Sequence, residues 1–510
     1  MKKSNRILSL VIAALMASSL LASCDRLPTV GGDTTDTTDT GAVTDTDTDA
    51  VTGEDTEISD SGDTATDTEA LPEVESTPLA IADEALEAAL REIADKPSGE
   101  LLLSDFAAID TLKLAGKGIT DITPLADFHW VKSVDLSYNS GIKDYAPLAK
   151  MESLTSVRAA DCGITDVTPF AAIDGLLSLD LSANPIENFA PLAVLVDLES
   201  LDLSETEIGD LSVLTGLTEL LTLNLYNNNI FDITALSGMT WLVDLNLFAN
   251  NISDVTPLSE MNFMERLNLG GNKVTDISSL KKLNNMTLLD LSYNPISDIS
   301  TVSVMTELNT LILNDTTVTD LTPIKNRNTI TELNINNTGI SDISPLAGLS
   351  ELKILLACLN NIEDITPLWE LCELSVLDLS GNNISDILPL EKLAKLRELD
   401  ISYNNITKLT DLEYVTALTT LDVGNNSISD ITVLENLTAL TTFKASHNKI
   451  FDIDALGGLT ELAVIDITNN AVSDISALAK LENLTVLRAM NNHITDWSPV
   501  ADVPTVLGND

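Results

Sequence analysis

The sequence predicts an α/β solenoid: a curved right-handed coil with a parallel sheet on its concave side and short 3-10 turns on its convex side. Three observations predict it. One pattern recurs every 22 residues from position 117 to position 492, with a single step of 23. Each copy alternates apolar and polar residues, as in Leu377-Asp378-Leu379, which indicates a short strand with both Leu inward. No copy can bury its Leu face alone, so the copies must stack.

The N-terminal segment, residues 1–23, is typical of a secretory signal. A basic start precedes an apolar stretch at 7–22, and small residues stand just before Cys24. This pattern resembles the lipobox of bacterial lipoproteins. The resemblance implies a covalent lipid at Cys24, cleavage after Ser23 and display on the extracytoplasmic cell surface. The lipid would be the only membrane contact. An ordinary signal peptide with a chance cysteine is the alternative.

The next segment, residues 24–78, reads as a spacer. Its residues 25–78 contain 16 acidic side chains and one basic side chain, and much of it is Asp and Thr. With few apolar groups to bury, it is expected to be disordered, and its like charges should extend it. The run from Asp45 to Asp49 imitates the start of a calcium loop, but Ala50 and Thr56 replace the Gly and Glu that such a loop requires. We therefore expect no metal.

The array itself is predicted to hold 18 repeats within residues 109–500. The pattern L-x-x-L-x-L-x-x-N-x-I-x-D-I-x-P-L-x-x-L resembles that of leucine-rich repeats, and its length resembles the bacterial internalins. In pairs such as Ser344-Pro345, Ser is expected to cap a 3-10 turn that begins at Pro. The Asn that 13 of the 18 copies carry is expected to bind backbone groups that the turn leaves unpaired. This structural ladder comprises Asn139, Asn184, Asn228, Asn250, Asn272, Asn294, Asn360, Asn382, Asn404, Asn426, Asn448, Asn470 and Asn492.

Both ends of the array should be covered. Residues 79–108 are predicted to form a helical N-terminal cap, since Leu86, Leu90 and Ile93 fall on one helical stripe. Residues 501–510 are too short for a domain and are interpreted as a minimal C-terminal cover.

Composition excludes several function classes. The chain has 27 Lys+Arg against 78 Asp+Glu, a net charge of -51, so no nucleic-acid partner is expected. Three His and four Cys leave little for a metal or other cofactor. We also expect no enzyme activity, because an open concave sheet gives a residue such as His447 no sheltered site in which to act.

Outward positions of the predicted strands carry three candidate binding features. Tyr226 and Phe248 fall in one column of adjacent repeats, which suits a binding hot spot. A second group is apolar where the face is otherwise polar, although drift in a degenerate repeat would explain it equally. A third is a column of carboxylates that could attract a basic partner or a divalent cation, or could simply be solvated. The second group is Ile312, Ile354, Leu356, Cys358 and Leu359; the third is Asp378, Asp400 and Asp422.

The sequence thus predicts a monomeric surface protein that recognises a macromolecule, a protein in the first place, without catalysis. A structural or glycan-binding envelope component without a discrete protein partner is the alternative.

Overall fold

The computed structural model describes Val74 and residues 76–508 of the chain. The predicted signal, most of the predicted spacer and the proposed lipidation site Cys24 lie outside these residues. No helix in the described ranges is long and apolar enough to cross a lipid bilayer.

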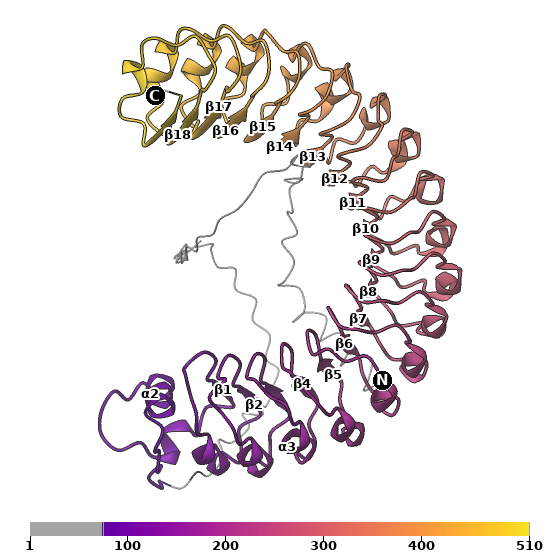
Figure 1. Ribbon diagram of the computed structural model, residues 1–510, viewed down its shortest axis with the longest axis vertical. Helices are drawn as coiled ribbons and strands as arrows, with labels where there is room; N and C mark the ends of the chain where they lie inside the picture. The colour runs from indigo at the N-terminus through magenta and orange to yellow at the C-terminus, as the bar shows by residue number, and fades with distance from the viewer. Residues whose placement is uncertain (1–73, 75, 509–510) are drawn as a thin grey trace, which may run out of the picture. The chain divides into compact units, whose positions relative to one another are not determined.

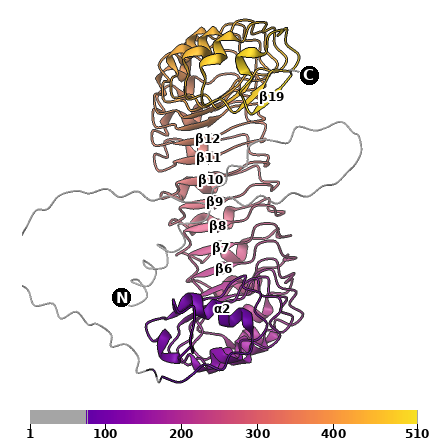
Figure 2. The same ribbon diagram turned by 90° about the vertical axis from the view of Figure 1, so that its left-hand side faces the viewer.

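One parallel sheet of 19 strands runs through the described residues, and each strand pairs with the next in chain order. Figure 1 shows the strands on the inner side of the curved array and the turns on its outer side, and Figure 2 shows β6 to β12 stacked as rungs. The predicted fold class is confirmed. The strands are β1 Thr111–Lys113, β2 Ser133–Asp135, β3 Ser156–Arg158, β4 Ser178–Asp180, β5 Ser200–Asp202, β6 Thr222–Asn224, β7 Asp244–Asn246, β8 Arg266–Asn268, β9 Leu288–Asp290, β10 Thr310–Ile312, β11 Glu332–Asn334, β12 Ile354–Leu356, β13 Val376–Asp378, β14 Glu398–Asp400, β15 Thr420–Asp422, β16 Thr442–Lys444, β17 Val464–Asp466, β18 Val486–Arg488 and β19 Thr505–Leu507.

The convex side carries a short helical turn in each repeat. Its apolar residue is buried in the core, and so is the strand Leu, as Leu346 of a turn and Leu377 of a strand show. The turns are α3 Thr168–Ala171 and the 3-10 helices η1 Leu103–Phe106, η2 Thr123–Asp127, η3 Ala146–Lys150, η4 Ala190–Val194, η5 Ser212–Leu214, η6 Thr234–Gly238, η7 Thr256–Leu258, η8 Ser278–Lys282, η9 Ser300–Val304, η10 Thr322–Ile324, η11 Ser344–Gly348, η12 Thr366–Leu368, η13 Leu388–Lys392, η14 Thr410–Leu412, η15 Thr432–Asn436, η16 Asp454–Gly458, η17 Ser476–Lys480 and η18 Ser498–Val500.

The capping residue of these turns differs from the prediction. Ser344 is itself the first residue of η11, and its N–H donates to Asp342 Oδ1 at 2.8 Å. The same bond joins Thr366 to Asp364. The recurring Asp of the pattern, and not the Ser or Thr, is therefore the cap. Hydrogen bonds from Ser344 hold the pKa of Asp342 below its usual value.

The Asn ladder joins successive repeats. In one example, Asn382 Nδ2 donates to the carbonyls of Ala357 in the preceding repeat and Leu379 in its own, each at 2.9 Å. Its Oδ1 accepts from Ile362 N–H of the preceding repeat at 3.0 Å. All 13 predicted ladder residues make bonds of this kind. Thr338, which replaces Asn, keeps a bond to its own repeat through Oγ1.

The ends are closed differently. Helix α2 spans Glu84–Ile93, and Asp83 is its N-cap residue. Asp83 Oδ1 accepts a hydrogen bond from the Leu86 N–H, and Oδ2 accepts from the N–H groups of Thr120 and Asp121 in the first repeat. These bonds lower the pKa of Asp83 to about 2 despite the opposing effect of its partial burial. At the other end, the segment predicted as a mere cover forms β19, which extends the sheet by one strand.

Candidate binding surface on the concave face

The last residue of most strands has a structural role that the sequence alone does not predict. In 12 strands this residue is Asp or Asn, and its Oδ1 accepts the N–H of the residue two positions later. Such a local bond satisfies backbone that leaves the sheet ladder. One oxygen is thus used, and the second atom, Oδ2 of Asp or Nδ2 of Asn, remains for contacts on the concave face.

Of the other seven strands, four end in Lys or Arg, and three (β10, β12 and the last strand, β19) end in an apolar residue that cannot make this bond. Ile312 ends β10 and Leu356 ends β12, where neither can cap the backbone. After β12 the N–H of Cys358, which Leu356 cannot accept, donates to Asn336 Oδ1 of the preceding repeat at 2.7 Å. Both apolar side chains remain partly exposed, so burial in the core does not explain them.

Around β12 the apolar surface is smaller than the sequence suggested. Ile354 and Leu356 are half-buried, and Leu359 is 39% exposed. Cys358 is fully buried, so the expectation that it faces outward is wrong. It occupies the same position as Ser380 of the next repeat, which is also buried. Cys372 is a free, exposed cysteine.

The aromatic pair is fixed in place by a glycine. Tyr226 and Phe248 stack with ring centroids 5.8 Å apart and an interplanar angle of 25°. At Gly270, the next residue in the column, a Cβ would lie 2.6 Å from the Phe248 ring. The ring therefore fills space that only glycine leaves open, and both rings remain half-buried. A pre-positioned aromatic pair of this kind loses little entropy on binding.

Asparagine amides border this pair. Asn246 and Asn268 use Oδ1 to cap the backbone, and their Nδ2 groups have no acceptor within the described part of the chain. Asn224 Nδ2 donates to Asp202 Oδ2 at 2.8 Å. The surface next to the rings thus offers hydrogen-bond donors held in a fixed orientation.

The three carboxylates lie on adjacent strands in register. Burial, and then the charge of Asp400, raise the pKa of Asp378 to about 6, and the same two causes raise the pKa of Asp422 to about 6. Lys444 Nζ approaches Asp422 Oδ2 at 3.6 Å. All three carboxylates are partly buried.

Asp400→Asn is expected to stabilise the fold at neutral pH by about 1 kcal/mol, because it removes the middle charge while Asn keeps the backbone cap. Carboxyls with raised folded pKa values contribute stability that is full below about pH 4 and is lost as the pH rises through about 6. The gain should therefore vanish near pH 4. Denaturant unfolding of variant and wild type at both pH values measures it, and equal stability at pH 7 would contradict the stacking effect.

Two cations elsewhere on the concave face are already paired. Arg158 lies 3.4 Å from Asp180, and Arg266 lies 3.3 Å from Asp244. Neither Asp378 nor Asp400 has an ion-pair partner among residues 76–508.

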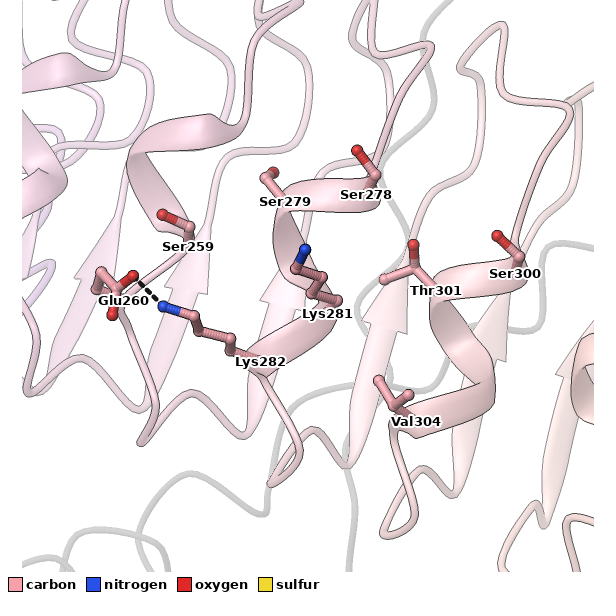
Figure 3. Close-up of a pocket in the computed structure, with 9 residues that line it drawn as sticks. All are labelled: Ser259, Glu260, Ser278, Ser279, Lys281, Lys282, Ser300, Thr301 and Val304. Carbon is pink, nitrogen blue, oxygen red and sulfur yellow. Dashed lines mark hydrogen bonds and ion pairs between the residues drawn. The ribbon is translucent and has the colours of Figure 1, made fainter.

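A separate hollow of about 450 Å³ lies on the convex side (Figure 3). Ser279 and Thr301 stand there where the neighbouring repeats have Pro257 and Pro323, so hydroxyls replace proline rings. Lys282 pairs with Glu260 across its rim. The lining consists of Ser259, Glu260, Ser278, Ser279, Lys281, Lys282, Ser300, Thr301 and Val304.

A second stacked aromatic pair is not among the candidates predicted from the sequence. Trp241 and Phe263 stack at 4.9 Å in the segments that lead from the convex turns into β7 and β8. Their spacing of one repeat was a usable signal, but they fall outside the strands. They lie away from the outward strand positions and provide a matched control for Tyr226 and Phe248.

The one histidine singled out in the sequence lies on the surface. His447 Nε2 lies 2.9 Å from Asn469 Nδ2 on an exposed turn. No group of three or more His, Cys, Asp or Glu residues in these ranges is placed to hold a metal ion.

Comparison with known proteins agrees with this geometry. A family model described as leucine rich repeats (2 copies) matches residues 263–304 and 372–414. These two segments thus consist of leucine-rich repeats. No curated protein matches the sequence.

Solved structures share the leucine-rich-repeat fold. An internalin from Listeria monocytogenes is 27% identical, with a TM-score of 0.52, covering 81% of this chain and 97% of that chain. A leucine-rich-repeat protein of Leptospira interrogans is 21% identical, with a TM-score of 0.58 and coverage of 74% and 94%. The ectodomain of the Arabidopsis receptor kinase HAESA, in complex with a peptide hormone ligand, is 20% identical, with a TM-score of 0.58 and coverage of 73% and 72%.

Proposed function

We propose that this protein is a lipid-anchored, extracytoplasmic surface protein that recognises a protein partner through the concave face of its leucine-rich repeats, without catalysis. The observation that carries the proposal is the pair Ile312 and Leu356. Both side chains are apolar and half-buried, and they stand in a column where Asp or Asn caps the backbone in 12 strands, so they offer a surface on which another molecule can pack.

Two further observations support it. Tyr226 and Phe248 form a pre-positioned aromatic anchor, the kind of group that dominates binding energy at protein interfaces. The similar solved structures include an internalin and a receptor ectodomain in complex with a peptide hormone ligand.

Glycan recognition is the second candidate. It is favoured by the amide donors of Asn246 and Asn268 beside the aromatic pair, because sugar hydroxyls can accept from amides while a sugar C–H face lies on a ring. Protease treatment of the partner extract separates the two: a protein ligand is destroyed and a free glycan is not.

Photo-crosslinking tests the proposed surface. The full chain, with p-benzoylphenylalanine at position 226 or 356, is irradiated with envelope and host-surface extracts, and position 304 on the convex side serves as the control. We expect protein adducts from positions 226 and 356 but none from position 304. Adducts from position 304 alone would contradict concave-face recognition, and adducts that survive protease treatment of the extract would favour a glycan.

A further inference from the structure

The concave surface of β10–β15 combines two chemistries. Its first part is apolar, with Ile312, Ile354 and Leu356 half-buried. Its second part is the stack of Asp378, Asp400 and Asp422, and Leu356 pairs directly with Asp378 in the register of β12 and β13. We call these six residues the apolar–acidic surface.

The charges in its acidic part are uncompensated. Asp378 and Asp400 each use Oδ1 to accept from Ser380 and Ser402, and no hydrogen-bond donor or cation reaches either Oδ2 within residues 76–508. Lys444 touches only the last carboxylate, Asp422. Like charges one strand apart, about 5 Å, repel one another unless something compensates.

A backbone cap alone does not require these charges. Asn makes the same cap at Asn246 and Asn268, and it carries no charge to repel its neighbours. At three consecutive strands the chain therefore has Asp where a neutral Asn would serve the fold equally well. These strands lie directly beside β12, which has an apolar side chain in place of the capping residue.

We propose that the apolar–acidic surface binds a segment of a partner protein that carries apolar side chains followed by Lys or Arg. Apolar side chains of the segment pack on Ile354 and Leu356, and its cations approach Oδ2 of Asp378 and Asp400. Partial burial of these carboxylates makes such pairs less sensitive to salt than contacts with fully exposed charges. This inference rests on the proposed protein recognition and names the chemistry of the partner.

The test uses two fluorescent ten-residue peptides and the full chain at about 0.15 M salt. One peptide has the sequence Leu-Ser-Leu-Ser-Leu-Arg-Ser-Arg-Ser-Arg, and in the other each Arg is Glu. Fluorescence anisotropy gives the affinity of wild type and three variants. The first variant, Asp378→Asn with Asp400→Asn, keeps both backbone caps. The second, Leu356→Asn, introduces the cap that β12 lacks, so both variants should fold.

The matched control is Asp342→Asn with Asp364→Asn on the convex turns. It removes the same two charges, and Asn188 shows that Asn can cap such a turn. We expect the Arg peptide to bind, with a loss of at least about tenfold in the Asp378/Asp400 variant and in Leu356→Asn, and less than about twofold in the control. The Glu peptide should not bind.

The opposite results overturn the inference in distinguishable ways. Equal loss in the convex control would mean that only the net charge of the chain attracts the peptide. If Leu356→Asn weakens binding of the Arg peptide but Asp378→Asn/Asp400→Asn does not, the proposed apolar recognition would stand and the inference of a basic partner would be wrong. Absence of Arg-peptide binding, or equal binding of the Glu peptide, also sinks the basic partner, while crosslinking from positions 226 and 356 would still stand.

Discussion

Asn382→Ala is expected to destabilise the repeat array by about 3 kcal/mol or more. The change leaves three buried backbone groups without their partner: the carbonyls of Ala357 and Leu379 and the N–H of Ile362. Each unsatisfied buried group costs about 1–3 kcal/mol, so the sum exceeds the cost of an ordinary surface substitution.

The damage should be local. Each repeat contacts only its neighbours, so the two interfaces beside Asn382 should open before the rest of the array. Hydrogen exchange should show lost protection in β12 and β13 and little change in β2 and β3. Denaturant unfolding gives the total loss of stability.

Asn382→Thr is the graded control for this change. Thr338 keeps a hydrogen bond from Oγ1 to Ile335 O within its own repeat, although it lacks the reach of Asn to the preceding one. The Thr variant should therefore lose less stability than the Ala variant. A loss below about 1 kcal/mol for Asn382→Ala, or equal losses for both variants, would mean that the ladder is not a principal stabilising element.

Much of the fold could be predicted because its signals are local and repeated. The alternation in Leu377-Asp378-Leu379 and the Asn that recurs in 13 of the 18 copies each specify geometry that is repeated from one coil to the next. The one longer step appears in the structure as the offset between Ser133 and its partner Ser156.

Other features depend on how neighbouring coils meet, and these the sequence could not provide. Cys358 looked outward by alternation but is buried because the chain has left the strand at that point. The second role of residues such as Asp378, a backbone cap through Oδ1, requires a turn whose shape no spacing reveals. For the same reason, the sequence predicts a cap at the Ser that precedes Pro, whereas Asp342 accepts the hydrogen bond from the first N–H of the turn.

Concave-face recognition is the central claim, and loss of the aromatic pair should affect it most. Tyr226→Ala with Phe248→Ala removes two stacked rings, and truncation of hot-spot residues costs at least about 2 kcal/mol, or roughly thirtyfold in affinity. The fold should tolerate the change, because both rings are only half-buried and small residues occupy the same column in neighbouring repeats, as Ser204 and Gly270 do.

The measurement is capture of envelope and host-surface proteins by the immobilised full chain, compared among wild type, the Tyr226/Phe248 variant and a control with Trp241→Ala and Phe263→Ala. The control removes an equivalent stacked pair from outside the strands. We predict that a protein captured by wild type is retained by the control and lost with Tyr226→Ala/Phe248→Ala. Capture that is indifferent to this pair, or is lost only in the control, would contradict recognition by the concave aromatic pair.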